Sequence, residues 1–210
     1  MNLDDFKKCP ILGILRGISE KMVGPIVDLS LSAGLRAIEV TMNTPNAPSL
    51  IQKMVKAADG RLAVGAGTVL ALKELQMALD AGATFIVSPI LVAEIAVDCV
   101  KRRIPFFPGA LTPQEIYSAW QAGATMVKVF PASQVGPSYF KDIKGPFDTI
   151  ELLACGGVNA SNIKDFFLNK ASAVAFGNNI FKPDLLEKKD FSGIETGIRD
   201  LLAGIPWQTK

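Results

Sequence analysis

The chain has 210 residues, and its 22 basic and 20 acidic side chains leave a formal net charge of only +2. Apolar residues make up 49% and charged residues 20%, which is ordinary globular usage and is enough for one sizeable core but scarcely for two. The balanced charge argues against nucleic acid as a partner. The absence of histidine removes Ser-His and Cys-His nucleophile pairs and His-ligated zinc.

The three cysteines, Cys9, Cys99 and Cys155, lie far apart and form no CxxC pair. This spacing predicts reduced thiols in a cytoplasmic protein rather than a disulfide framework or a metal site. The N-terminal segment shows no signal-peptide pattern, and no uncharged apolar run reaches the ~18 residues of a membrane helix. We therefore expect a single domain with no membrane partner.

Short apolar, β-branched runs recur along the chain with helix-length segments between them. Two of those segments, residues 72–82 and 91–103, are typical of helices, and Gly34, Gly82 and Gly123 are predicted to provide left-handed caps before the next strand. The predicted strands are residues 11–16, 36–41, 61–67, 84–88, 104–108, 125–130, 150–156 and 172–177.

Strands that alternate with helices indicate a parallel sheet. Eight such units over residues 1–210 predict one closed (β/α)8 TIM barrel. The alternative is an open doubly wound sheet, although no GxGxxG motif follows the first strand. In a barrel the chemistry lies at the carboxyl ends of the strands, so polar residues at those ends are the candidates for a site.

Lys128 interrupts an otherwise apolar strand. Alternation places Lys128 and Phe130 on one side of that strand, while Val127 and Val129 face the helices. We therefore expect Lys128 to point into the barrel, where desolvation lowers the pKa of an amine and favours attack on a carbonyl to form a Schiff base. The alternative is a structural cation that reaches the barrel mouth or pairs with Glu39.

Glu39 is a second charged residue within an apolar strand, on the same predicted face as Ala37. A carboxylate beside a Schiff-base lysine is a natural general acid and base. The alternative is a structural partner that only neutralises Lys128.

Other strand ends offer groups that bind anions. Arg16 closes the first strand and Thr68 follows the third, so both are candidates for binding a carboxylate. The alternatives are that Arg16 pairs with a neighbouring acid and that Thr68 caps a helix. Turns after the last two strands present backbone N–H groups that suit a phosphate, unless they are plain turns. The residues at these turns are Gly156, Gly157, Gly177 and Asn178, and Pro89 and Phe130 are expected to wall the pocket.

These segments, in this order and spacing, resemble the 2-keto-3-deoxy-6-phosphogluconate (KDPG) aldolase family, which also includes 4-hydroxy-2-oxoglutarate (KHG) aldolases. The resemblance runs from about Pro10 to Phe181. The matching segments are Glu39-Val40-Thr41, residues 64–70, Ser88-Pro89, Pro108-Gly109, residues 128–132 and residues 156–158.

The resemblance implies a (β/α)8 barrel, usually a homotrimer, that works through a lysine Schiff base without metal or other cofactor. Lys128 matches the Schiff-base lysine, Glu39 the general acid and base, and Thr68 a residue near the substrate carboxylate. Pro89 and Phe130 match the pocket wall, and Gly156, Gly157 and Gly177 match the phosphate loops.

Two positions depart from the gluconate-type pattern. Asn43 stands where a carboxylate-binding arginine is usual, and Asn178 stands where a serine often helps to bind phosphate. Arg16 together with Asn43-Thr44-Pro45 resembles the branch of 2-dehydro-3-deoxy-6-phosphogalactonate aldolases. We expect Arg16 to replace the missing arginine at the carboxylate, with Asn43 beside it, and a backbone N–H at Asn178 to serve the phosphate.

The implied reaction is reversible cleavage of KDPG, or a close analogue, to pyruvate and glyceraldehyde 3-phosphate. The galactonate analogue and 4-hydroxy-2-oxoglutarate are alternative substrates. More distant alternatives are a sugar-phosphate isomerase or epimerase that uses Glu39 as a base without a covalent lysine, and a non-catalytic barrel that binds a phosphorylated ligand.

Overall fold

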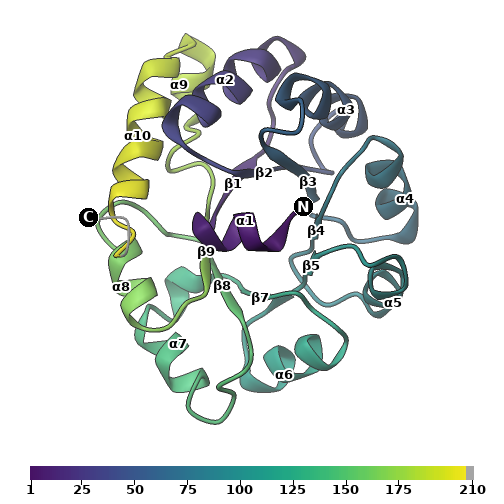
Figure 1. The fold of residues 1–210 in the computed structure, drawn as a ribbon, viewed down its shortest axis with the longest axis vertical. Coiled ribbons are helices and arrows are strands. Elements are labelled where there is room, and N and C mark those ends of the chain that lie inside the picture. Colours follow the sequence, from purple (N-terminus) through teal and green to yellow (C-terminus); the bar gives the residue numbers. More distant parts are fainter. Residues whose placement is uncertain (207–210) are drawn as a thin grey trace.

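The computed structural model describes residues 1–206, in which parallel strands form a nearly closed barrel inside a ring of helices (Figure 1). The strands are β1 (Ile11–Leu15), β2 (Ala37–Thr41), β3 (Ala63–Gly67), β4 (Ile86–Val87), β5 (Phe106–Phe107), β6 (Gly109–Ala110), β7 (Val127–Val129), β8 (Leu152–Cys155) and β9 (Ala173–Phe176). Their order in the sheet is β5-β4-β3-β2-β1-β9-β8-β7-β6.

The helices alternate with the strands, as the sequence predicts. They are α1 (Leu3–Lys8), α2 (Val23–Ala33), α3 (Ala47–Ala58), α4 (Leu72–Asp80), α5 (Ala93–Arg102), α6 (Pro113–Gln121), α7 (Ser138–Ile143), α8 (Ile163–Leu168), α9 (Pro183–Lys188) and α10 (Phe191–Ala203), with short 3-10 turns at Glu20–Met22 and Ala132–Gln134. Within residues 1–206, no helix is long and apolar enough to cross a bilayer.

The barrel closes through two short strands that meet at Pro108. β5 pairs with β4 and β6 pairs with β7, so the two ends of the sheet are joined by consecutive residues of the chain. The strand predicted over residues 104–108 shortens to β5, and β6 follows beyond the predicted end, because Pro108 has no N–H to donate to a ladder and interrupts the pairing. The (β/α)8 prediction is confirmed, and the open doubly wound alternative is wrong.

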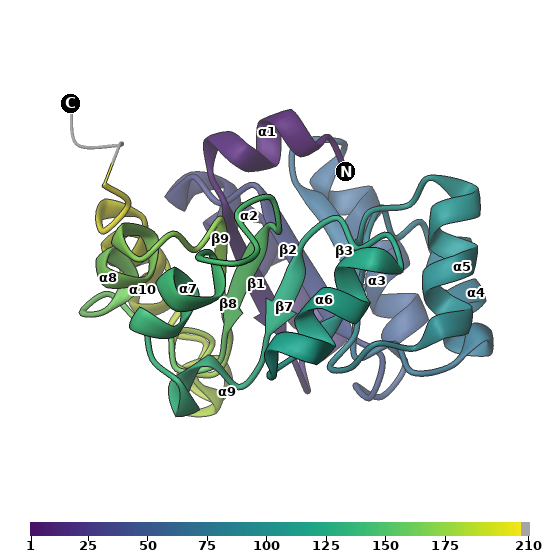
Figure 2. The same cartoon turned by 90° about the horizontal axis from the view of Figure 1, so that it is seen from below.

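The buried apolar side chains form two clusters, one inside the barrel and one between the strands and the helices. Met126 belongs to the interior cluster, whereas Val127 and Val129 pack in the layer between strands and helices, as alternation predicts. α1 lies across the amino-terminal opening of the barrel (Figures 1 and 2), and the Phe6 ring meets Phe107 edge-on, with centroids 6.2 Å apart. The interior is therefore covered at that end, and access lies at the carboxyl ends of the strands.

The remaining differences from the sequence prediction concern boundaries and additions. The strand predicted over residues 84–88 shortens to β4, and Arg16 lies in the loop just after β1 rather than at its end. The additional helices are α1 and α9, whereas α10 follows β9 and packs against α2, which completes the ring of helices (Figure 1). The three predicted glycine caps do adopt positive φ angles, at Gly34, Gly82 and Gly123.

Closure of the barrel requires a glycine at position 109. A Cβ atom at Gly109 would overlap the backbone carbonyl of Pro89, which cannot move aside as a side-chain end would. We predict that Gly109→Ala lowers the free energy of unfolding by about 1–3 kcal/mol, the usual effect of overpacking, measured by urea denaturation. Gly24→Ala is the matched control, because a Cβ there meets nothing within 4 Å. Equal stability of the two variants would contradict this account of closure.

Candidate active site

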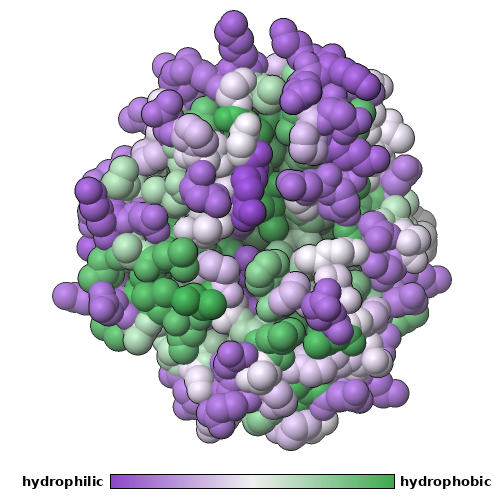
Figure 3. All heavy atoms as spheres, turned by 180° about the vertical axis from the view of Figure 1, so that it is seen from behind, coloured by the Kyte–Doolittle hydropathy of each residue, from purple (hydrophilic) through white to green (hydrophobic). Residues whose placement is uncertain are grey.

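The side chains of Lys128 on β7 and Glu39 on β2 point into the barrel, as the sequence predicts. Their residues are 6% and 1% exposed, among the few buried polar residues of the described chain. The Lys128 Nζ atom lies 4.9 Å from the centroid of the Phe130 ring, a cation–π distance. Figure 3 views the face opposite α1, and the surface is hollowed near the centre of that face. A deeply buried amine and carboxyl are thus presented to the open end of the barrel.

The Glu39 carboxyl occupies space that a glycine leaves free. A Cβ at Gly67 on the neighbouring strand β3 would overlap Glu39 Oε1, and Glu39 Oε2 is buried without a hydrogen-bond partner within residues 1–206. Burial raises the pKa of Glu39 from its ordinary 4.5 to about 7, while the positive charges of Lys128 and Arg16 oppose that rise. The carboxyl is therefore poised both to release and to accept a proton near neutral pH.

Lys128 and Glu39 do not form a direct ion pair. The ion pairs of the described residues join other side chains at N···O distances within 4.0 Å, and Lys128 takes part in none of them. Because Lys128 is also only 6% exposed, it does not extend into solvent at the barrel mouth. Lys128 still acts on Glu39 through its charge, which lowers the pKa of that carboxyl against the effect of burial.

Cys155, the last residue of β8, is an additional neighbour of this pair that sequence reasoning treated only as a free thiol. Burial raises the pKa of the Cys155 thiol, and the nearby Lys128 lowers it by charge and by a hydrogen bond. The thiol therefore lies beside Lys128 as a neutral group. The sequence could have identified Cys155 by its position, two residues after Leu153 on the inward face of a strand.

Arg16, Asn43 and Thr68 follow the adjacent strands β1, β2 and β3. Arg16 is exposed and close enough for its charge to act on Glu39, and Asn43 is also exposed. Thr68 is half-buried and has a φ of 57°, a strained conformation for a β-branched residue. Within residues 1–206 no hydrogen bond or ion pair is found for these three side chains, so their polar groups are free to bind a ligand.

The pocket-wall and phosphate-loop residues lie around the same opening. Pro89 follows β4 and is half-buried, while Phe130 is 40% exposed beside Lys128. Gly156 and Gly157 follow β8 with φ angles of 99° and 79°, which only glycine adopts readily. Asn178 follows β9 and is exposed.

One predicted phosphate donor is already engaged. The Gly177 N–H donates to Asn179 Oδ1 at 3.2 Å, and Asn179 Nδ2 donates to the Val158 carbonyl oxygen. Asn179 thereby ties the loop after β9 to the loop after β8. Sequence reasoning did not assign this role to Asn179, because it depends on a contact between loops 21 residues apart.

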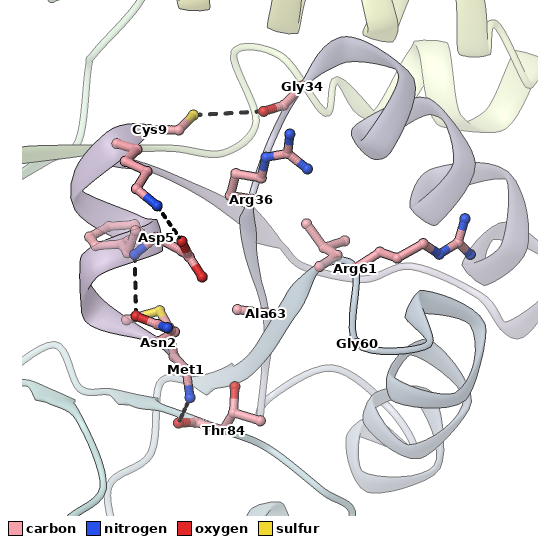
Figure 4. Close-up of a pocket in the computed structure, with 13 residues that line it drawn as sticks. Met1, Asn2, Asp5, Cys9, Gly34, Arg36, Gly60, Arg61, Ala63 and Thr84 are labelled. Carbon is pink, nitrogen blue, oxygen red and sulfur yellow. Dashed lines mark hydrogen bonds and ion pairs between the residues drawn. The ribbon is translucent and has the colours of Figure 1, made fainter.

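A separate cavity lies at the opposite end of the barrel. It has a volume of about 660 Å³ beside α1 and is lined by residues that include Cys9, Arg36, Arg61 and Thr84 (Figure 4). Neither Lys128 nor Glu39 reaches it. Because parallel barrels carry their chemistry at the carboxyl ends of the strands, this cavity is not the candidate active site.

The raised pKa of Glu39 predicts a pH-dependent stability. The folded protein holds a proton on Glu39 up to about pH 7, whereas the unfolded chain loses it near pH 4.5, so stability present below pH 4.5 is lost as pH rises to 7. Relative to Glu39→Gln, the wild type should lose roughly 3 kcal/mol of unfolding free energy across this interval. Urea denaturation at both pH values measures it, with the exposed Glu94→Gln as control. A constant difference between wild type and Glu39→Gln would contradict the raised pKa.

Comparison with known proteins places this geometry in a family. Residues 3–196 match the family model described as KDPG and KHG aldolase. A probable 2-dehydro-3-deoxy-6-phosphogalactonate aldolase of Rhizobium meliloti is 32% identical over 178 residues, which is 84% of each chain. The KHG/KDPG aldolase of Escherichia coli is 30% identical over 181 residues, 86% of this chain and 84% of that one.

A solved structure described as native KDPGal shares the fold. It superposes with a TM-score of 0.87 over 93% of both chains, at 26% sequence identity. The match to the family model covers most of the chain, including every residue of the candidate site, and each of the two relatives covers more than four fifths of the chain. The chain is therefore a member of the KDPG and KHG aldolase family.

Proposed function

We propose that this protein is a class I aldolase, which cleaves a 2-keto-3-deoxy-6-phospho sugar acid through a Schiff base on Lys128 and needs no metal or other cofactor. The observation that carries the proposal is the placement of Lys128 and Glu39, both buried at the open end of the barrel without an ion pair between them. An amine and a carboxyl of this kind are the two groups that imine chemistry requires.

The proposed reaction begins when the Lys128 amine attacks the C2 ketone and forms a carbinolamine. Protonated Glu39 gives its proton to the departing hydroxyl, and water leaves as the iminium forms. The Glu39 carboxylate then takes the proton of the C4 hydroxyl, the C3–C4 bond breaks, and its electrons move into the enamine as the aldehyde leaves. Glu39 returns the proton to C3, and hydrolysis of the iminium releases pyruvate. A pKa of about 7 suits Glu39 to both directions of transfer.

The groups at the open end of the barrel match the carboxylate and the phosphate at the two ends of the proposed substrate. The unpaired Arg16 guanidinium suits the carboxylate, with the free polar groups of Asn43 and Thr68 nearby. The glycine turn at Gly156 and Gly157 suits the phosphate. These assignments favour a phosphorylated sugar acid over the unphosphorylated 4-hydroxy-2-oxoglutarate.

The gluconate acid and its galactonate analogue are the two candidate substrates. Asn43 together with Arg16 favours the galactonate analogue, in agreement with the name of the Rhizobium meliloti relative. The two named relatives differ by only two percentage points of identity, 32% and 30%, so identity alone does not choose between these substrates.

Turnover with purified substrates tests the proposal. Wild-type protein should release pyruvate from a 2-keto-3-deoxy-6-phospho sugar acid, and Lys128→Arg should lower kcat by about 10³ or more, because a guanidinium keeps the charge but forms no imine. A panel of the gluconate, galactonate and 4-hydroxy-2-oxoglutarate substrates ranks kcat/KM. Activity that survives Lys128→Arg would overturn the aldolase and favour an isomerase or epimerase. Stabilisation by ligand without turnover would favour a non-catalytic barrel.

Loss of the carboxylate clamp predicts a change in KM. Arg16→Ala should raise the KM for the keto acid about tenfold or more, because a charge-assisted hydrogen bond to the carboxylate is lost. Steady-state kinetics measures the change, and Lys101→Ala, which removes an exposed cation on α5, is the control. An unchanged KM in Arg16→Ala would remove Arg16 from the carboxylate site.

We also propose that the active form is a homotrimer in the cytoplasm. A strongly apolar area lies on one side of the surface in Figure 3, and α4, α5 and the loops before them carry exposed apolar side chains, which commonly mark interfaces. These side chains are Leu70, Leu72, Met77, Ile90, Val97 and Val100. Light scattering should report the mass of three chains; a monomer would contradict the trimer.

The cytoplasmic location rests on the three cysteines. They are free and buried, which suits a reducing compartment.

A further inference from the structure

A buried pair of hydroxyl groups lies beneath the loop that carries Arg16. Thr41 and Thr44 are 0% and 3% exposed, and their Oγ1 atoms lie 3.0 Å apart. The backbone N–H of Gly17 donates to Thr44 Oγ1, also at 3.0 Å. The hydroxyls therefore connect the end of β2 with the residue that directly follows Arg16.

This connection begins where the strand ladder ends. The last paired residues of β1 and β2 are Leu15 and Val40, and Gly17 then turns the chain with a φ of 67°. In the described chain, the hydrogen bond from Gly17 to Thr44 is the one found between the loop of residues 16–19 and the loop of residues 42–46. The Arg16 side chain itself makes no bond that would fix it, so its direction depends on how this backbone is held.

The hydroxyl pair also links the loop that carries Arg16 to the strand that carries Glu39. Thr41 lies two residues after Glu39 on the same strand, and period-two alternation puts both on the inward face. Thr44 is held in turn by its own N–H, which donates to the Thr41 carbonyl oxygen at 2.9 Å. The hydrogen bonds of Thr41 and Thr44 therefore set the position of Gly17 relative to strand β2. Through Gly17 they also set the position of Arg16.

We propose that Thr44 is a positioning residue for catalysis, which holds the Arg16 loop so that the guanidinium meets the substrate carboxylate. The inference rests on the proposed aldolase function and on Arg16 as the clamp. Thr44 touches no reacting atom, so its loss weakens keto-acid binding while the chemistry at Lys128 and Glu39 continues. It acts on KM rather than on kcat.

Three substitutions isolate the hydroxyl. Thr44→Val keeps the shape and removes the acceptor for Gly17, and Thr44→Ser keeps the hydroxyl. Thr84→Val is the matched control, because Thr84 Oγ1 also makes a 3.0 Å hydrogen bond, to the Val64 carbonyl, at the amino-terminal end of the barrel. We expect Thr44→Val to raise the KM about tenfold with kcat within twofold of wild type, and Thr44→Ser and Thr84→Val to retain the wild-type KM. Thr44→Ala replaces the valine variant if thermal unfolding shows that the latter is not folded.

A double-mutant cycle with Arg16→Ala separates positioning from a general structural effect. If Thr44 acts through Arg16, adding Thr44→Val to Arg16→Ala raises the KM no further. Additive effects on KM, an equal fall in kcat, or failure of serine to rescue would each overturn the inference while leaving the aldolase intact. A folded wild type without aldolase turnover would overturn the proposed function, and this inference with it.

Discussion

The burial of two ionisable groups inside the barrel is the constraint on which the rest of the structure depends. Removing an amine and a carboxyl from water is costly unless they are paired, and Lys128 and Glu39 are not in direct contact as an ion pair. The protein tolerates this because the carboxyl can remain protonated, with a pKa of about 7, and because the Phe130 ring lies beside the amine. In the proposed mechanism, this unfavourable burial is the source of the reactivity of the pair.

The architecture keeps this buried pair accessible from one side. α1 and Phe6 cover the amino-terminal opening, so the barrel interior below the pair is filled with apolar side chains. Glycine at position 67 provides the space for the carboxyl, and glycine at position 109 lets the strands close around it. The groups proposed to bind substrate then come from loops at the opposite end, which vary without disturbing the barrel.

Much of the fold and the central pair could be predicted because both follow from short-range periodicity. Alternation within a strand was sufficient to place Lys128 and Glu39 inward, and the strand–helix rhythm was sufficient for the barrel. Periodicity ends a strand at Pro108 and misses β6, the two-residue strand just beyond it, because so short a strand shows no alternation. Thr44 and Asn179 escaped prediction because each acts through a contact between separate loops, which no local pattern records.

The central claim is that Lys128 is the nucleophile, and reductive trapping tests it most directly. Protein incubated with saturating pyruvate is reduced with borohydride, digested and analysed by mass spectrometry. The account predicts one reduced pyruvate adduct, on the peptide that contains Lys128, and none in the Lys128→Arg variant. No adduct from folded wild-type protein, or an adduct on another lysine instead, would contradict it.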